Sequence, residues 1–290
     1  MLIFILRRNL IMATKIICVD AGHGYNTGGR RCPKKLDPAE HREWWLNDRI
    51  ADLVETELVR DYDCKVVRAD DTTGAKNISL ANRVKTANSA NAHMYISIHH
   101  NAGANGTTAG GTVVYSYKND TDKARAVRLY NYLIAQTNLK GNRSTPTAVG
   151  NFYVINKTKM PALLCEMAFM DSSVDVPILL TDDFAQKSAK GIINFLVAEL
   201  KLEKKKVVAT PKPTTTPTVQ SSLYYPKCDK KYTTIYSALT SIGVNGSYSF
   251  RRKIARANNI GGLGGLAYTG TAQQNTQMLN LLKAGLLIKA

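Results

Sequence analysis

The sequence predicts an α/β fold with a mostly parallel central sheet flanked by helices, followed by a small, largely helical C-terminal domain. Short runs rich in β-branched and aromatic residues alternate with helical patterns between residues 15 and 202. This alternation is typical of a parallel sheet with crossover helices. Residues 204–222 are rich in Lys, Pro and Thr, which favours an extended linker. Residues 223–290 contain only short helical patterns separated by glycine-rich breaks.

The α/β part begins with a strand that leads into the glycine-rich segment DAGHG. Apolar residues recur at helical spacing over residues 43–60, and Ser79 is the expected N-cap of a helix over 79–90. Two more helices are expected over 120–136 and 181–202. The expected strands are KIICVD (15–20), CKVVRAD (64–70), MYISIH (94–99), GTVVYSY (111–117), FYVIN (152–156) and ALLCEMAF (162–169).

These patterns divide the chain into three parts. We expect a main domain over residues 12–203, a linker over 204–222 and a C-terminal domain over 223–290. The chain has 290 residues, of which 44% are hydrophobic, so a sizeable core can form.

Positive charge is concentrated in the C-terminal part. The formal net charge is +17, but residues 12–203 hold 24 basic and 21 acidic residues, a net +3. Residues 223–290 hold 9 basic and 1 acidic residue, a net +8. A basic module favours a polyanionic partner, such as nucleic acid, anionic lipid or a cell-wall polymer. The near-neutral main domain argues against a nucleic acid as its partner.

The N-terminus and the cysteines indicate where the protein is made. The chain begins MLIFILRRNLIMATK, in which the apolar residues precede the arginines and no small-residue cleavage site follows. That order differs from a secretory signal, and the run is too short to span a membrane. Met1 and Met12 are alternative starts. Five dispersed cysteines do not form a disulfide pattern. We expect synthesis in the cytoplasm without a signal peptide, and no membrane span.

Four polar residues lie at the expected strand ends and helix start, where α/β proteins commonly have their functional sites. His23, His99 and Glu166 each follow or end an expected strand, and Glu43 opens a helix. The carboxyl ends of parallel strands meet at one edge of a sheet. Two imidazoles and a carboxylate are a standard ligand set for catalytic zinc, and another carboxylate can serve as acid and base. Composition alone does not tell which glutamate binds metal.

Two adjacent histidines, His99 and His100, stand in the run SIHHN. Successive side chains of a strand point to opposite faces of the sheet. Only one of these two histidines can therefore face the site.

Four motifs follow one another along the α/β part. They are GHG at 22–24, EWWLNDRIA at 43–51, SLANRVKTAN at 79–88 leading to SIHHNA at 97–102, and MPALLCEMAFMD at 160–171. In this order they resemble the motifs of the zinc-dependent N-acetylmuramoyl-L-alanine amidases of the Amidase_3 type, which cleave peptidoglycan. The resemblance covers essentially all of residues 15–202.

The resemblance implies roles for four residues. His23, Glu43 and His99 would bind one Zn²⁺, and Glu166 would be the catalytic acid and base. The implied reaction is hydrolysis, by zinc-activated water, of the amide between N-acetylmuramic acid and the L-alanine of the stem peptide in Gram-positive cell walls. The SIHxN register selects His99 as the ligand and leaves His100 turned away, or at most as a residue that supports the ligands or lines the groove.

Other side chains near the motifs have separate interpretations. Arg143, in the loop over 141–151, and Asn101 are candidate substrate contacts. His41 lies two residues before Glu43 and could compete with it as a ligand, but we interpret it as a solvated loop histidine. We interpret Arg83 as a structural pairing residue.

The C-terminal part, with three expected short helices, resembles more weakly the wall-binding modules of phage lysins and autolysins. Together these features predict a phage or prophage endolysin that acts on the wall after release, its C-terminal domain binding a wall polymer. A host autolysin or sporulation amidase of the same chemistry is the alternative within the class. A non-catalytic wall-binding protein, a nucleic-acid-binding protein with a degenerate hydrolase domain and a generic helical interaction domain are alternatives from other classes.

Overall fold

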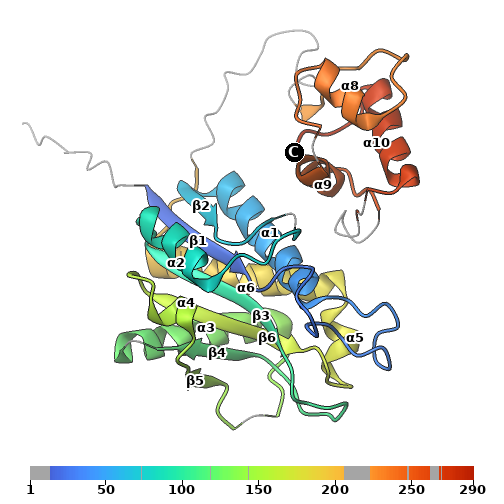
Figure 1. The fold of residues 1–290 in the computed structure, drawn as a ribbon. Helices are drawn as coiled ribbons and strands as arrows, with labels where there is room; N and C mark the ends of the chain where they lie inside the picture. Colours follow the sequence, from blue (N-terminus) through green and yellow to red (C-terminus); the bar gives the residue numbers. More distant parts are fainter. Residues whose placement is uncertain are drawn as a thin grey trace, which may run out of the picture.

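The computed structural model describes residues 14–72, 74–117, 119–142, 144–205, 223–246, 248–261, 268 and 270–290. The first 13 residues, most of the expected linker and Arg143 lie outside the described residues. We call residues 14–205 the α/β region and the described residues from 223 to 290 the helical region (Figure 1). Each region has its own cluster of buried apolar side chains.

A six-stranded sheet with the strand order β2-β1-β3-β6-β4-β5 forms the centre of the α/β region (Figure 1). Only the β4–β6 pair is antiparallel among the pairs of this sheet. The prediction of a mostly parallel sheet is confirmed. The strands are β1 (Lys15–Ala21), β2 (Cys64–Arg68), β3 (Met94–Asn101), β4 (Val113–Ser116), β5 (Thr147–Val149) and β6 (Ala162–Phe169).

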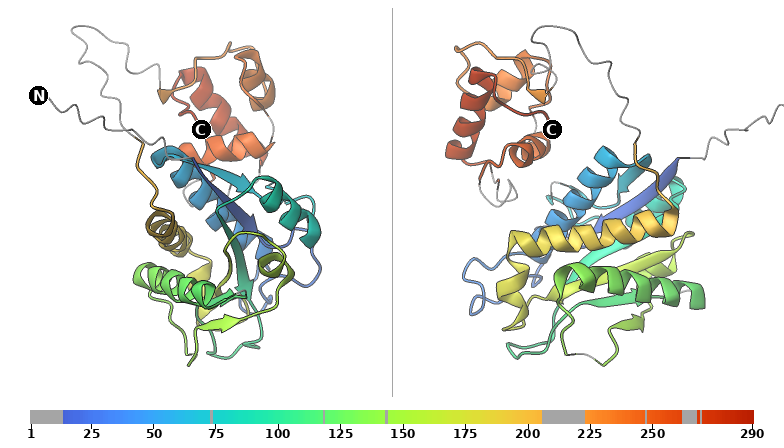
Figure 2. Two further views of the ribbon diagram at one scale, coloured as in Figure 1. Left: turned by 90° about the vertical axis from the view of Figure 1, so that its left-hand side faces the viewer. Right: turned by 180° about the vertical axis from the view of Figure 1, so that it is seen from behind.

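Helices pack on both faces of the sheet (Figure 2). Side chains of α1, α3 and α6 join the main core on one face, whereas those of α2 and α4 join a smaller cluster on the other. Ser79 caps α2 by accepting a hydrogen bond from the backbone N–H of Asn82, as expected. The helices of this region are α1 (Glu43–Asp61), α2 (Leu80–Ser89), α3 (Asp120–Thr137), α4 (Tyr153–Asn156), α5 (Asp175–Leu179) and α6 (Asp182–Leu200).

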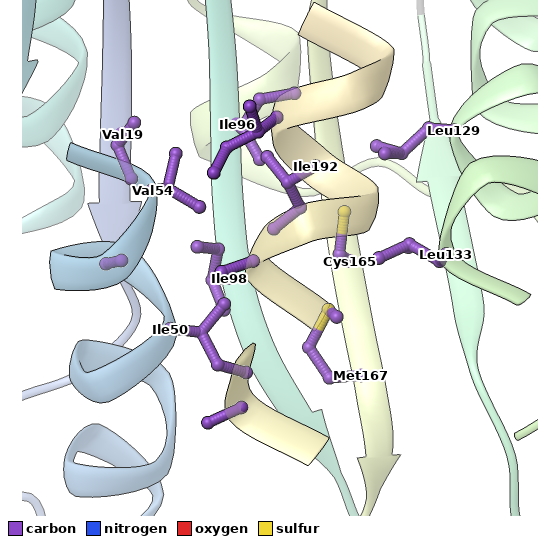
Figure 3. Packing of buried hydrophobic residues seen from close by; sticks show 14 of the residues in the cluster. Val19, Ile50, Val54, Ile96, Ile98, Leu129, Leu133, Cys165, Met167 and Ile192 are labelled. Atoms are coloured by element: carbon purple, nitrogen blue, oxygen red, sulfur yellow. The ribbon is translucent and has the colours of Figure 1, made fainter. Parts of the chain in front are cut away.

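The main core forms because alternate strand residues face the same helices. Figure 3 shows Ile96 and Ile98 of β3 beneath Ile50 of α1 and Ile192 of α6. Cys165 of β6 belongs to the same cluster, next to α3. These side chains are all fully or almost fully buried, so the core fixes the strands that lead to the site.

The prediction of a strand over residues 152–156 is wrong. These residues form the single helical turn α4, which Phe152 precedes as its N-cap. Two consecutive residues, Val154 and Ile155, are buried, whereas a half-buried strand would alternate. They pack against α2, so tertiary contact overrides the β propensity of the run. The extra strand β5 lies instead within the segment expected to be a loop.

The helical region contains three helices, as expected, in its described residues: α8 (Ile235–Ser241), α9 (Tyr248–Ala257) and α10 (Ala272–Ala284). Thr271 and Gln274 form a reciprocal capping box at the start of α10. Gly285 ends α10 in the left-handed conformation, with φ of 74°. Among the residues that the structure describes, no helix is long and apolar enough to cross a membrane.

Candidate active site

Parallel strands bring the candidate site residues to one edge of the sheet. His23 follows β1, and His99 of β3 lies opposite Glu166 of β6 in the strand register. Glu43 is the first residue of α1, whose buried face packs against β1 and β3. Residues up to 143 positions apart in the chain therefore meet where the carboxyl ends of β1, β3 and β6 come together.

Three side chains converge into one group of metal-ligating atoms. Glu43 Oε2 lies 3.2 Å from His23 Nε2, and Glu43 Oε1 lies 3.1 Å from His99 Nδ1. The ligand atoms of all three residues lie within 4.8 Å of one another. The two imidazole rings are edge-on, with centroids 5.0 Å apart.

This donor set fits a zinc ion. Zinc bonds of about 2.0–2.2 Å in tetrahedral geometry place neighbouring donor atoms about 3.3 Å apart. The separations of 3.1 and 3.2 Å are close to that spacing. Burial disfavours the charged form of Glu43, but its close contacts with the rings of His23 and His99 outweigh this effect and hold the pKa of Glu43 well below its usual range. The group thus offers an ionised carboxylate and two nitrogen donors.

Arg83 of α2 holds the backbone around His23. Its guanidinium donates hydrogen bonds to the carbonyl oxygens of His23, at 2.6 Å, and Ala21, at 2.7 Å. The same guanidinium pairs with the buried carboxylate of Asp20. His23 has a positive φ of 69°, a conformation that a non-glycine residue keeps only when its surroundings fix it. The interpretation of Arg83 as a structural pairing residue is confirmed.

Asn47 connects Gly22 and His100, the residues next to the candidate ligands His23 and His99. Its side-chain N–H donates to the carbonyl oxygen of Gly22, at 3.1 Å, and its Oδ1 lies 2.8 Å from Nδ1 of His100. A Cβ added to Gly22 would lie 2.1 Å from the ring of His99, so only glycine leaves room for that ring. Gly22 and the ring of His99 are therefore in close contact.

His100 lies outside the donor group. It is buried, and burial lowers its pKa to about 3, so it stays neutral. Its backbone N–H donates to Glu43 Oε1 at 3.3 Å. His99 and His100 thus have different environments, as strand alternation predicts.

Glu166 of β6 lies beside the donor group with a largely buried carboxyl group. Its buried Oε2 has no hydrogen-bond partner among the described residues. Burial, together with the negative charge of Glu43, raises the pKa of Glu166 to about 7, although His99 and Arg30 act in the opposite direction. A carboxyl group with this pKa can both accept and release a proton near neutral pH.

The other residues singled out from the sequence lie outside the group of metal-ligating atoms or outside the described residues. Asn101 ends β3, and its side-chain oxygen accepts a hydrogen bond from the N–H of Ala102, at 2.9 Å. His41 lies 2.9 Å from a carboxylate oxygen of Asp37, stacks on Trp45 and is not part of the donor group. The interpretation of His41 as a solvated loop residue is therefore incomplete, because this ring is only half exposed and has a fixed partner. Arg143 lies outside the described residues.

Sequence reasoning missed two contributors to the site. Arg30 accepts the backbone N–H of Glu43 through its carbonyl oxygen, at 2.9 Å, and its charge acts on Glu166. Asn47 stands in the EWWLN motif, but its partners lie on other segments, so no local pattern indicates them. Arg30 lies in a basic loop without a periodic pattern, and no sequence signal distinguishes it from its neighbours.

Comparisons with known proteins agree with this geometry. A family model described as N-acetylmuramoyl-L-alanine amidase, Amidase_3, matches residues 17–198. The chain is 28% identical over 188 residues to the N-acetylmuramoyl-L-alanine amidase CwlM of Bacillus licheniformis, covering 65% of this chain and 70% of CwlM. It is 26% identical over 201 residues to the endolysin of Bacillus phage SPP1, covering 69% and 71%.

A solved structure shows the same fold. The catalytic domain of CwlV, an N-acetylmuramoyl-L-alanine amidase from Bacillus (Paenibacillus) polymyxa var. colistinus, superposes with a TM-score of 0.58 at 28% identity. The match covers 66% of this chain and all of the CwlV domain. The family match spans more than half of the chain and includes His23, Glu43, His99 and Glu166. The chain therefore belongs to the Amidase_3 family of N-acetylmuramoyl-L-alanine amidases.

Proposed function

We propose that this protein is a zinc-dependent peptidoglycan hydrolase. It cleaves the amide between the lactyl group of N-acetylmuramic acid and the L-alanine of the stem peptide. The observation that carries the proposal is the convergence of His23, Glu43 and His99 at the sheet edge that also holds Glu166. The family match over this part of the chain supports the substrate.

Each of the four residues has a role in the reaction. His23, Glu43 and His99 would hold the zinc ion. Zinc bound there would lower the pKa of a water molecule and polarise the scissile carbonyl. Glu166 takes a proton from the attacking water with its carboxylate.

Glu166 then returns that proton to the departing nitrogen. The water oxygen forms a bond to the carbonyl carbon, the C–N bond breaks, and the amine of L-alanine leaves as the proton reaches it. A pKa of about 7 suits both halves of this transfer at neutral pH.

The buried partners of the donor group keep it preorganised. Arg83 and Asn47 fix the backbone of the segment that carries His23. The backbone N–H of His100 donates to the carboxylate of Glu43. Such outer partners set the orientation of ligands before the metal arrives.

The domain division and the cellular role are part of the proposal. Residues 12–203 form the catalytic domain, 204–222 the linker and 223–290 a domain that binds a wall polymer rather than nucleic acid. The net charge of +8 in the last segment suits an anionic polymer. The protein is made in the host cytoplasm and acts on the wall after release, as an endolysin, and similarity to the SPP1 endolysin supports this role. A holin gene next to the coding gene would support it further, whereas a sporulation or autolysin locus would favour the host alternative.

Product analysis of digested walls tests the chemistry. The full chain, loaded with zinc, should clear Gram-positive cell-wall suspensions and release new amino termini on L-alanine, with about one zinc per chain. Glu166→Gln is the matched control, because it keeps the shape of the side chain and removes the proton acceptor. Release of reducing sugars without new amino termini would contradict the amidase proposal.

A further inference from the structure

An acidic cluster lies on α1 and just after the end of β2, beyond the donor group. Asp48, Asp52 and Asp70 surround the guanidinium of Arg68, which lies 2.8 Å from Asp48 and 2.7 Å from Asp70 and also pairs with Asp52. All four side chains are buried or nearly so. One arginine therefore faces three buried carboxylates within the α/β region, and the more exposed Glu55 also lies 3.5 Å from it.

Two arginines of the helical region supply opposite charge to this cluster. Arg252 of α9 pairs with Asp48, and its guanidinium lies 3.4 Å from a carboxylate oxygen of Asp52. Arg256, one turn further along α9, pairs with Asp52. Asp48 and Asp52 are likewise four residues apart on α1, so two residues on one face of each helix meet.

Further contacts of Arg252 fix the position of its guanidinium. It donates to the carbonyl oxygen of Thr72, at 2.9 Å, and lies 5.7 Å from the ring centre of Trp44. Figures 1 and 2 show the helical region next to the end of the α/β region that carries α1 and β2. The contact thus joins segments about 200 residues apart in the chain.

Charge balance explains why this contact forms. Burial alone would raise the pKa of Asp52, but the charges of Arg256, Arg68 and Arg252 outweigh it and hold that pKa below its usual range. If the docked arrangement lacked the charges of the two α9 arginines, it would hold three buried carboxylates against the single cation of Arg68, which is costly. The helical region therefore neutralises a charge excess that the α/β region cannot balance with Arg68 alone.

We propose that Arg252 and Arg256 dock the helical region onto the acidic cluster, so that in solution the two regions form one particle. The docked region contacts α1, the helix whose first residue is Glu43. The partner that this acidic surface fits is thus the arginine face of α9 in the same chain. The docking does not depend on the proposed amidase chemistry, because the test measures the dimensions of the chain and not its activity.

Small-angle scattering of the full chain tests the docking. At low salt, Arg252→Gln/Arg256→Gln should have a larger radius of gyration than the unaltered chain. The matched control is Lys230→Gln/Lys253→Gln, which removes the same charge from exposed positions of the helical region, one of them between the two arginines on α9. The control should keep the original radius, with circular dichroism verifying that both variants stay folded.

A salt titration of the unaltered chain tests the same contact without mutation. Its radius of gyration should increase between about 50 mM and 1 M NaCl, because salt screens the charges that the undocked regions expose and so favours the undocked state. The double arginine variant should show no such increase. An equal radius for the unaltered chain and the arginine variant would overturn the docking, and so would equal expansion of the lysine control.

Discussion

Arg83 donates a hydrogen bond of 2.6 Å to the carbonyl oxygen of His23 while its guanidinium also pairs with the buried Asp20. Asp20 in turn accepts hydrogen bonds from the hydroxyl groups of Tyr95, at 2.7 Å, and Ser97, at 2.9 Å. A fully buried polar network thus supports the backbone of a candidate metal ligand that has a positive φ. The network joins β1, β3 and α2, so the position of His23 depends on how the sheet and α2 pack.

Arg83→Lys should weaken zinc binding about 10- to 100-fold, because lysine cannot donate to Asp20 and to two carbonyl oxygens at once. Competition with a chelator measures the affinity. Arg128→Lys is the matched control, since Arg128 pairs with Glu199 at the surface, away from the site. Unchanged affinity in Arg83→Lys would show that the network does not position His23.

Glu166→Gln should retain zinc and lose activity by a factor of about 10²–10⁴, the usual contribution of a general acid and base. Metal content and the rate of amino-terminus release are measured on the same preparation. Glu43→Gln is the comparison, and it should lose zinc. If instead Glu166→Gln loses zinc and Glu43→Gln keeps it, the roles of the two glutamates are reversed.

His99→Ala should abolish zinc binding, whereas His100→Ala should keep it. His100 donates no atom to the donor group, but its burial and its contact with Asn47 mean that truncation leaves a cavity and an unsatisfied amide. We expect a loss of about 2–4 kcal/mol in the free energy of unfolding for His100→Ala. Metal analysis together with denaturant unfolding separates the two effects, and loss of zinc in a folded His100→Ala variant would contradict the assignment.

Glu166 should contribute a loss of stability to the metal-free protein as the pH rises from about 4.5 to 7. The usual pKa of 4.5 applies to Glu166 in the unfolded chain, and burial first of all raises it to about 7 in the folded protein. The folded state therefore holds a proton that the unfolded state has lost, and stability decreases through this window. The effect is on the order of 3 kcal/mol from the size of the pKa change.

Glu166→Gln carries no titratable group and should not show that part of the decrease. Denaturant unfolding of both metal-free proteins at pH 5 and pH 8 measures it. The stability difference between Glu166→Gln and the unaltered protein should move in favour of the variant as the pH rises. A constant difference would show that the pKa of Glu166 is not raised in the folded state.

Local patterns in the sequence determined much of the fold and the candidate site. The expected strand ends and helix start predicted that His23, Glu43, His99 and Glu166 lie near one another. This prediction does not depend on the details of packing, because the carboxyl ends of parallel strands meet at one edge of the sheet. Helical spacing over residues 43–60 likewise predicted α1 correctly. Such patterns depend only on residues close together in the sequence, so they can be recognised without knowing which segments pack against each other.

Tertiary structure alone decided which groups touch. Residues 152–156 have high β propensity but form a turn of helix, because Val154 and Ile155 both bury against α2. The position of Glu43 between the two imidazoles, with Glu166 on the neighbouring strand, follows from strand register and the packing of α1. The pairing of Arg252 with Asp48 spans 204 residues, and no local pattern encodes a contact of that range. Periodicity specifies the face that a residue occupies, whereas its partner depends on the assembled sheet and helices.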